Sequence, residues 1–446
     1  MRPVLKRIFL FFGICQPKRE VDKNRLRVLI SGGYGYGNLG DEAQLAANLQ
    51  QWRNASPNCR LTVLTPNREY THDMHSSIRV ELAPRKALFG LAGRQYFGSK
   101  RLFKFAFFWV AGICLFNACL IRAGLPTFCL TLAQARLLDE INDTDVLFLS
   151  GGGYLTGMTL TRLWDNMLLI RLAHALNVPT ILSGQTIGLF KDPVSRFLAK
   201  WGLNKAQMIY LRDSVDSRKA LDGLGISDAK IGCTFDDALF FKGTSSEYVD
   251  QLLSEAGIDP QKPYVAVNVH YWGQTPDSSR RIMRSMAGAL RKLQMDLGLQ
   301  IVFVPMSYPD ENAIEEVRAA MEMPCAVAKH AYRPDLAVSI IQKADLCITM
   351  KHHPIIFAMA AAVPTIAMVF DDYYHHKNLG AMKLFHNEEY LLKSTTGDFE
   401  LELLEMARNA FINKVNISKS LAGVVEELRP FCGAVIYRFL QKKGSG

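Results

Sequence analysis

The sequence has nine cysteines but no C-x-x-C pair, and an odd number cannot all pair within one chain. Their scattered positions disfavour both a disulfide framework and a zinc site, so we expect a reducing, cytoplasmic environment. There is also no internal repeat and no low-complexity tract. With 446 residues, of which 49% are hydrophobic, the chain is long enough for two sizeable domain cores and is not a disordered protein.

Acidic residues are absent between Glu81 and Asp139, a stretch that carries eight basic residues. The first twenty residues add five bases against one acid, so these two segments together carry +12 and the rest of the chain −2, which gives the net charge of +10. The positive charge is therefore local. It lies in apolar segments without a recognised nucleic-acid-binding module, so we expect no nucleic-acid partner.

The two basic segments contain dense apolar runs at 8–14 and 105–121. The second run reads FAFFWVAGICLFNACLI, has seventeen residues, which is the lower limit for crossing a hydrocarbon core of about 30 Å, and contains Asn117. Two interpretations stay open. One is a membrane-interfacial or re-entrant segment within 85–136 that is attracted to anionic lipid, which would make the protein peripheral at the inner face of the membrane. The other is a buried helical hairpin. The N-terminal segment 1–24 lacks the cleavage site of a signal peptide, so we expect it to be retained.

Short apolar runs alternate with helical stretches along most of the chain. The expected strands are 26–30, 61–65, 146–150, 180–183 and 208–211 in the first half, and 264–269, 301–304, 346–349 and 365–369 in the second. This alternation predicts parallel sheets that are covered by helices on both faces. The sequence therefore predicts an α/β protein of GT-B-like architecture, with two doubly wound, Rossmann-like domains facing a cleft. The expected parts are a segment 1–24, a domain 25–245 with a basic apolar insertion at 82–138, and a domain 246–446 that includes C-terminal helices.

The stretch SGGYGYGNLGDE at 31–42 contains a G-x-G-x-x-G pattern, which is typical of dinucleotide-binding turns. However, the expected helix opens with Asp41 and Glu42, whose carboxylates would repel a pyrophosphate. The following strand ends in Thr65 and not in the acidic residue that would bind ribose hydroxyls. We therefore expect no dinucleotide cofactor.

Glycine-rich and charged motifs follow the expected strands in both halves. They are NLGDE at 38–42, SGGGYL at 150–155, GQTIG at 184–188, LRDS at 211–214, FDDA at 235–238 and TMKHHPIIFAMAAAVP at 349–364. In this order they resemble the motifs of the polysaccharide pyruvyl transferases, and the resemblance runs from about residue 26 to 385. YHHKNLG at 374–380 further resembles the Y-x-H-K-x-x-G of the colanic-acid type. The resemblance implies a transferase that moves a pyruvyl group from phosphoenolpyruvate onto a sugar as a cyclic ketal, in a surface polysaccharide or its lipid-linked precursor.

Phosphoenolpyruvate carries a phosphate and a carboxylate on a small carbon frame, so its pocket needs fixed cations. Arg212 and Lys351 are the candidate donor-binding cations, with an internal ion pair as the alternative role of each. The family commonly has arginine at the position of Lys351, which puts the bidentate grip on the donor in doubt. Further candidate substrate-binding residues are Asn38, Gly40, Gly152, Gly153, Gln185, His376 and Lys377.

The reaction also needs a proton on the donor methylene carbon and removes one from the attacking hydroxyl, and histidine does both near neutral pH. The resemblance places His353 at the family's catalytic histidine, which makes it the first candidate for acid or base. Asp41 would orient or deprotonate the acceptor, with capping of the first helix as its alternative role. The resemblance thus implies that the second domain mainly holds the donor, with Arg212 reaching across the cleft, and the first domain the acceptor.

No metal or other cofactor is expected, because the carboxylates and histidines at 371–376 match no coordination template and the chemistry needs no metal ion. Two other functions stay open. One is a GT-B glycosyltransferase that uses a nucleotide sugar, and the other is a non-catalytic relative that binds glycan or lipid. Nothing in the sequence indicates an oligomeric state.

Overall fold

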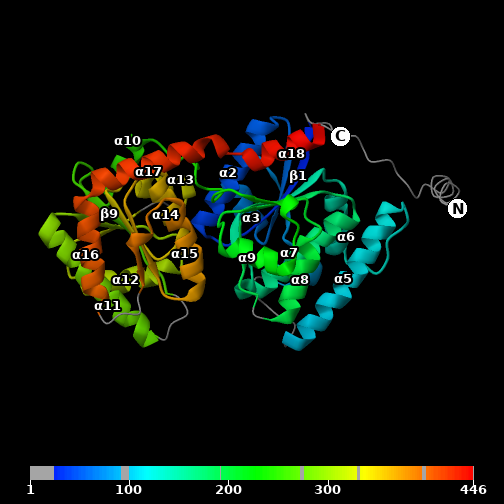
Figure 1. Cartoon of the computed structure of the whole chain (residues 1–446), viewed down its shortest axis with the longest axis horizontal. Coiled ribbons are helices and arrows are strands. Elements are labelled where there is room, and N and C mark those ends of the chain that lie inside the picture. The colour runs from blue at the N-terminus through cyan, green and yellow to red at the C-terminus, as the bar shows by residue number, and fades with distance from the viewer. Residues whose placement is uncertain are drawn as a thin grey trace. The chain divides into compact units, whose positions relative to one another are not determined.

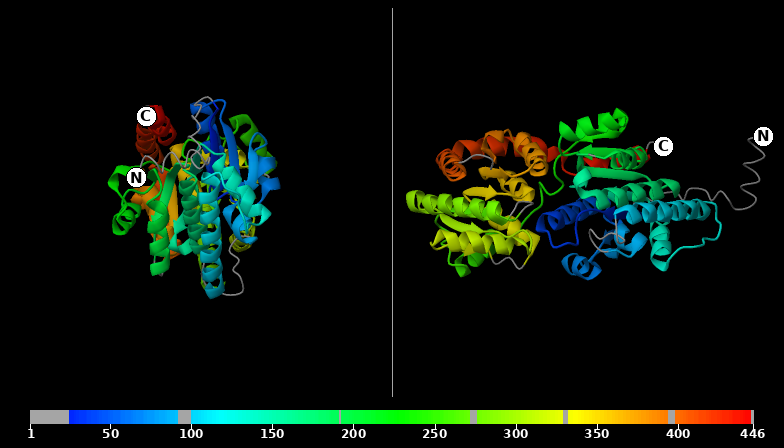
Figure 2. Two further views of the ribbon diagram at one scale, coloured as in Figure 1. Left: turned by 90° about the vertical axis from the view of Figure 1, so that its right-hand side faces the viewer. Right: turned by 90° about the horizontal axis from the view of Figure 1, so that it is seen from below.

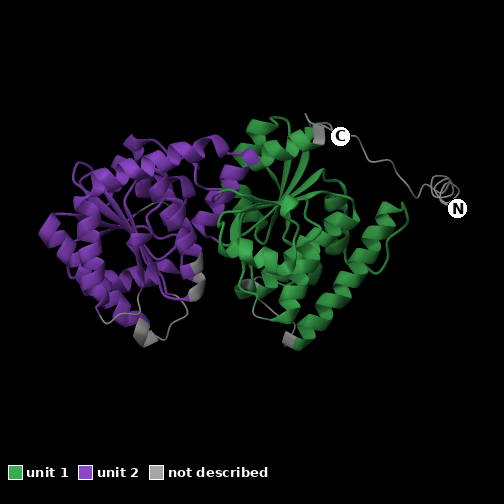
Figure 3. Ribbon diagram, in the orientation of Figure 1, with its two compact units in different colours: residues 1–36, 49–234, 435–446 green, residues 37–48, 235–434 purple. Residues whose placement is uncertain are grey.

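The computed structural model describes residues 25–91, 100–190, 192–271, 276–328, 332–393 and 398–444. These residues form two α/β units, each built on one parallel sheet (Figures 1 and 3). The expected α/β class with two doubly wound domains is confirmed. The expected N-terminal segment 1–24 lies outside the described residues.

The division into units does not follow one boundary near residue 245. Unit 1 comprises 1–36, 49–234 and 435–446, and unit 2 comprises 37–48 and 235–434. Helix α2 (Leu39–Ala55) therefore begins in unit 2 and ends in unit 1, and α18 (Ala434–Gly444) returns almost entirely to unit 1. Packing explains both assignments: Leu39 lies in an apolar cluster with Val302 and Val304, whereas Phe439 packs edge-on against Trp52 with ring centroids 6.4 Å apart.

The sheet of unit 1 has the strand order β3-β2-β1-β4-β6-β7-β8, with β5 paired to β6, and all pairings are parallel. The strands are β1 (Arg27–Ser31), β2 (Arg60–Thr65), β3 (Arg79–Leu82), β4 (Val146–Leu149), β5 (Gly152–Thr156), β6 (Thr180–Gly188), β7 (Met208–Leu211) and β8 (Ile231–Cys233). Beside α2, the helices are α3 (Arg68–Met74), α4 (Pro84–Phe89), α5 (Lys100–Arg122), α6 (Leu132–Asn142), α7 (Leu160–Ala175), α8 (Pro193–Leu203) and α9 (Asp216–Leu224). The central strands β4 and β6 are wholly buried, as expected for a parallel sheet that helices cover on both faces.

The sheet of unit 2 has the order β11-β10-β9-β12-β13-β14, again wholly parallel. The strands are β9 (Tyr264–Asn268), β10 (Gln300–Phe303), β11 (Ala326–Val327), β12 (Leu346–Thr349), β13 (Thr365–Val369) and β14 (Leu391–Lys393). The helices are α10 (Ser246–Glu255), α11 (Pro276–Leu297), α12 (Asp310–Met321), α13 (Pro334–Gln342), α14 (His352–Ala360), α15 (Asp372–Leu384), α16 (Phe399–Ile412) and α17 (Lys414–Leu428). In each sheet the chain starts in the middle, winds to one edge and returns to fill the other, so the switch points lie between β1 and β4 and between β9 and β12.

Helix α5 contains the apolar run of the insertion. It runs along the outside of unit 1 beside α6 and α7 (Figures 1 and 2). Among the described residues, Arg101–Arg122 is the one helical stretch with the length and mean hydropathy, 1.9, to cross a membrane, and 28% of its most apolar window is buried. One face of α5 packs into the core of unit 1 and the opposite face is exposed. The helix is therefore buried along one face only, and not on all sides as in the alternative of a buried hairpin.

Candidate active site in unit 2

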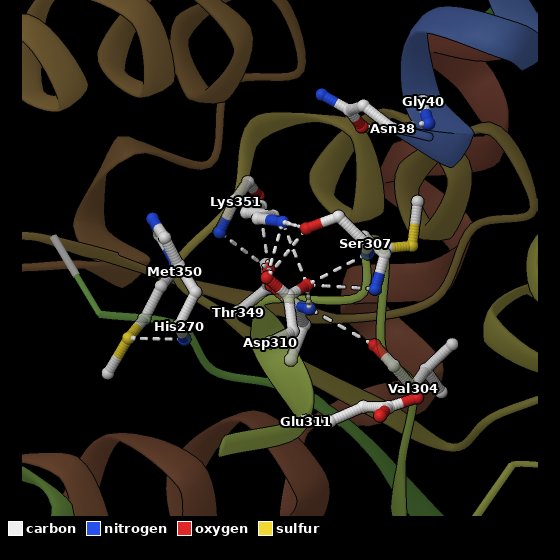
Figure 4. Close-up of polar contacts among 12 residues, drawn as sticks. Asn38, Gly40, His270, Val304, Ser307, Asp310, Glu311, Thr349, Met350 and Lys351 are labelled. Carbon is white, nitrogen blue, oxygen red and sulfur yellow. Dashed lines mark hydrogen bonds and ion pairs between the residues drawn. The ribbon is translucent and has the colours of Figure 1, made fainter. Parts of the chain in front are cut away.

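Lys351 follows β12 at the cap position of α14. Its Nζ lies 2.6 Å from Oδ1 and 2.8 Å from Oδ2 of Asp310, and 2.7 Å from Oγ of Ser307, and the three side chains point toward one another in Figure 4. Asp310 is 1% exposed and also accepts hydrogen bonds from the amides of Met306 and Ser307 and from Nδ2 of Asn268. The structure thus shows the internal ion pair that was the alternative role of Lys351.

These residues lie at the carboxyl ends of neighbouring strands. Asn268 ends β9, Met306 and Ser307 follow β10, and Lys351 follows β12. In open parallel sheets this is the edge at which ligands bind. Asp310 was not among the predicted site residues; its sequence signal is an acidic residue in the first turn of the helix that follows β10.

His353 lies in the first turn of α14 and is 4% exposed. Its imidazole packs against the backbone of Gly40, because a Cβ added to Gly40 would lie 2.0 Å from Nδ1 and 2.1 Å from Cγ of the ring. Phe357, one turn further along α14, stacks on the imidazole with ring centroids 6.1 Å apart. Only glycine allows such an approach of the α2 backbone to the ring.

The start of α2 is fixed to unit 2 by its backbone. The amide of Leu39 donates to the carbonyl of Met306 over 2.9 Å, and the amide of Gly40 donates to Oδ1 of Asn38 over 3.2 Å. The helix begins at Leu39, two residues before the expected start. Asn38 therefore supplies the side-chain acceptor at this end, and Asp41 lies within the first turn instead of capping it.

Further along α2, two buried amide side chains bind the FDDA motif. Nε2 of Gln44 lies 2.9 and 3.0 Å from the carboxylate oxygens of Asp236, and Nδ2 of Asn48 lies 2.9 Å from Oδ2 of Asp237. Asp236 also lies 3.4 Å from Nε2 of His352, and both of these side chains are at most 3% exposed. The neighbour of His353 is therefore held by a carboxylate that is itself anchored to α2.

This packing changes one expectation. The first domain was expected to contain Asn38, Gly40 and Asp41, and the second domain His353. All four residues belong to unit 2. The reason is the four-residue spacing of Gly40, Gln44 and Asn48, which gives α2 a second buried face that faces unit 2. Neither amide was among the predicted site residues.

His270 follows β9, and its Nε2 lies 3.0 Å from the hydroxyl of Tyr374 in α15. Burial lowers the pKa of His270 from 6.5 to about 3, and the positive charges of Lys351 and Lys377 contribute to the lowering. His270 is therefore neutral near pH 7 and has no imidazolium proton to donate. Lys351 and Lys377 therefore both lie close enough to His270 to affect its pKa. The side chain of His376 lies outside the described part of α15.

The remaining candidates lie in unit 1. Gln185 is wholly buried in β6, where its Nε2 donates to the carbonyl of Ser150 over 2.6 Å and lies 3.1 Å from the hydroxyl of Tyr154. Gly152 and Gly153 lie in β5, a buried strand that was not among the expected strands, since the SGGGYL motif was expected to follow the strand 146–150. Gly152 has a φ of 153°, and a Cβ there would meet the Tyr154 ring at 2.7 Å.

Arg212 follows β7, as expected, and is 7% exposed. Its Nε donates to Oγ1 of Thr186 over 2.8 Å. The neighbouring Asp213 accepts hydrogen bonds from the amides of Val215, Asp216 and Ser217 at the start of α9. Among the residues with described side chains in both units, no group of three or more His, Cys, Asp and Glu is placed to hold a metal ion.

Solved structures similar to this chain show the GT-B-type fold. HepE from Anabaena, solved in complex with UDP, superposes with a TM-score of 0.55 at 14% identity, covering 94% of this chain and all of HepE. A glycosyltransferase from Rickettsia africae gives 0.56 at 12% identity and covers 95% and 98%. UDP-GlcNAc 2-epimerase from Neisseria meningitidis, bound to UDP-GlcNAc, gives 0.56 at 12% identity and covers 94% and 100%.

No protein of curated function matches the sequence significantly. A family model does match, over the stretch that begins at the start of α2 and ends at the start of α15. Residues 38–372, which include Asn38, Arg212, Lys351 and His353, fit the model of the polysaccharide pyruvyl transferases, and the chain therefore belongs to the polysaccharide pyruvyl transferase family.

Proposed function

We propose that the protein transfers a pyruvyl group from phosphoenolpyruvate to two hydroxyls of one sugar, in a surface polysaccharide or its lipid-linked precursor, and forms a cyclic ketal. The observation that carries this proposal is the position of His353. It lies where two helices begin, in direct contact with Gly40 of α2 and two residues after Lys351. A titratable group at such a place lies beside the anion-binding start of α14.

The donor is an anion, and the surroundings of His353 suit one. The first turn of α14 carries no acidic side chain, and the positive end of its helix dipole favours a phosphate or a carboxylate. Lys377 adds positive charge near the carboxyl end of β9, where Lys351 also lies in its ion pair with Asp310. We propose that these groups hold the donor, and that Arg212 is a further donor-binding cation from unit 1.

The chemistry requires two proton movements. Two C–O bonds form at the central carbon of phosphoenolpyruvate, its bond to the phosphate oxygen breaks, and its methylene carbon gains a proton to become a methyl group. The two sugar hydroxyls lose one proton each, so one proton balances the new methyl group and the other leaves with phosphate. His353 is the proposed group that accepts and donates these protons, and Asp41, one residue after Gly40, is proposed to orient the acceptor hydroxyl.

The experiment that tests the donor is a comparison of ligands on the full-length protein. Isothermal titration calorimetry with phosphoenolpyruvate, UDP-glucose and UDP-GlcNAc is expected to show saturable binding of phosphoenolpyruvate alone. With a matching acceptor, mass spectrometry is expected to show an acid-labile ketal on the glycan and equimolar phosphate in solution. Binding of a UDP-sugar without binding of phosphoenolpyruvate would instead support a nucleotide-sugar glycosyltransferase.

A further inference from the structure

The exposed face of α5 is apolar along most of its length. Leu102, Phe105, Trp109 and Phe116 are between 51% and 73% exposed, and Gly112 completes the stripe. Their spacing of three, four, three and four residues places them on one side of the helix. We call this stripe the outer face of α5. The stripe is about 20 Å long, from a rise of about 1.5 Å per residue, and large exposed apolar patches of this kind mark interaction surfaces.

The opposite face of α5 is part of the core of unit 1. Phe103 and Phe107 pack on Trp164 with ring centroids 5.7 and 5.0 Å away, and Ala111, Cys114 and Ala118 are buried behind them. The polar residue of the apolar run is satisfied within the protein, because Asn117 bonds the carbonyl of Ile113 and both backbone groups of Phe128. A bilayer-spanning orientation would remove this face from its protein partners, so α5 is built to lie on a surface.

Basic residues border the outer face. Lys104 and Arg122 are eighteen residues apart, which is five helical turns, so both lie along the same edge of the stripe. Arg101 at the start of α5, Lys86 after the start of α4 and Arg136 on α6 are exposed as well. The segment between Glu81 and Asp139 contains no acid, so apolar and positively charged groups predominate on this surface, and Asp192 at the cap of α8 lies within electrostatic range of Lys104.

A cavity of about 480 Å³ lies between α4, α5 and α6 and opens beside this face. Apolar side chains form most of its lining, among them Leu88, Phe89 and Val110, and Trp109 belongs both to the lining and to the outer face. A lipid layer in contact with Trp109 would therefore also meet an apolar recess that can take part of an acyl chain.

We propose that the outer face of α5 binds the surface of a membrane that contains anionic lipid, with the helix in the plane of the interface. Aromatic and aliphatic side chains enter the boundary between head groups and acyl chains, while the flanking Lys104 and Arg122 contact lipid phosphates. The contact does not depend on the donor or on the chemistry of the transferase. It would bring unit 1 to the place where lipid-linked glycans reside.

Vesicle co-sedimentation of the full-length protein tests this surface. The protein is expected to bind vesicles of phosphatidylglycerol and phosphatidylcholine more tightly than vesicles of phosphatidylcholine alone, and 0.5 M salt is expected to weaken the binding. The variant Phe105→Ser/Trp109→Ser is expected to lower the partition coefficient by about tenfold or more, and so is Lys104→Glu/Arg122→Glu. The matched control is Ile412→Ser/Val415→Ser, because these residues are 72% and 73% exposed in unit 2 and should leave binding unchanged.

Fluorescence quenching locates the contact. Of the five tryptophans, Trp109 is 64% exposed, Trp52 and Trp164 are wholly buried and Trp201 is half-buried. Brominated acyl chains are expected to quench the wild type more strongly than a Trp109→Phe variant that still binds, because the other four tryptophans are common to both proteins. Binding that is equal in the wild type and in both α5 variants would overturn the proposal, because the membrane contact would then lie elsewhere. A concentration-dependent dimer that Phe105→Ser/Trp109→Ser abolishes, without vesicle binding, would overturn it in favour of a second copy on this face.

Discussion

Gly40 and His353 are in van der Waals contact, and the contact leaves no room for a side chain: a Cβ on Gly40 would lie 2.0 Å from the imidazole. The glycine that a dinucleotide-binding pattern would assign to a pyrophosphate instead allows the first turn of α2 to press against the candidate catalytic histidine. The two residues are more than three hundred positions apart, so this contact defines the register between α2 and α14. It also makes Gly40 a test of His353 that leaves the histidine itself in place.

Gly40→Ala is expected to displace the His353 ring and to lower acceptor-dependent phosphate release by on the order of a hundredfold, because a shift of about 1 Å at a reacting group has effects of this size. The double variant with His353→Ala should be no slower than His353→Ala alone. Gly423→Ala is the control, because a Cβ there meets nothing within 4 Å. Additive effects of the two substitutions would show that Gly40 acts by another route.

Lys351→Ala is expected to destabilise the protein by about 3–5 kcal/mol, because it leaves the buried carboxylate of Asp310 without its counter-charge. Lys351→Ala/Asp310→Asn should recover most of this loss in urea unfolding, while phosphoenolpyruvate binding stays weak if the lysine also contacts the donor. Arg218→Ala removes exposed ion pairs to Asp222 and Asp228 and is expected to leave the midpoint of urea unfolding nearly unchanged. Full recovery of donor binding in the double variant would limit Lys351 to a structural role.

Gln44→Ala is expected to cost about 1–3 kcal/mol, because Asp236 is 1% exposed and loses two short contacts to the amide. The exposed Gln50, on the same helix, is the matched control, and Gln50→Ala should change the free energy of unfolding by less than about 0.5 kcal/mol. Equal and small effects of both substitutions would show that the FDDA motif does not anchor α2.

The pKa of His270 predicts the direction of one pH effect. Since its folded-state pKa of about 3 lies below its ordinary value of 6.5, the folded protein favours the neutral ring. The neutral His270 ring therefore makes its full contribution to the free energy of unfolding above pH 6.5, and this contribution is lost as the pH falls from 6.5 toward 3. His270→Gln should lose less stability over this range than the wild type, and the exposed His72→Gln should follow the wild type. An unchanged slope in His270→Gln would contradict the assignment.

The strands were predictable where a continuous β-branched or aliphatic run is buried on both faces. Positions 208–211, 346–349 and 365–369 were predicted with their observed ends. Strand β5 was missed because its two glycines are typical of a loop. They occur in a strand here because Gly152 adopts a φ that other residues avoid and lies under the Tyr154 ring.

The sequence allowed us to predict which strand ends carry residues of the candidate site, but not which side chains contact one another there. Lys351 and His353 were identified from their motif, whereas Gln44, Asn48 and Asp310 were not, because their roles depend on partners that lie far away in the sequence. The division of α2 between two units could not be predicted for the same reason, because the partners of Gln44 and Asn48 lie far away in the sequence. Residues 37–48 group with unit 2 and the rest of α2 with unit 1, and only the three-dimensional structure shows where along the helix this division falls.

The central claim is that His353 serves a transfer from phosphoenolpyruvate. Its most direct test is acceptor-dependent phosphate release by purified full-length protein, with a panel of lipid-linked and polymeric glycans, for the wild type, His353→Ala and the exposed control His72→Ala. Phosphate release that requires a glycan, persists in His72→Ala and falls by about 10²–10⁴-fold in His353→Ala is the predicted result. Glycan-dependent release at the wild-type rate in folded His353→Ala would contradict it.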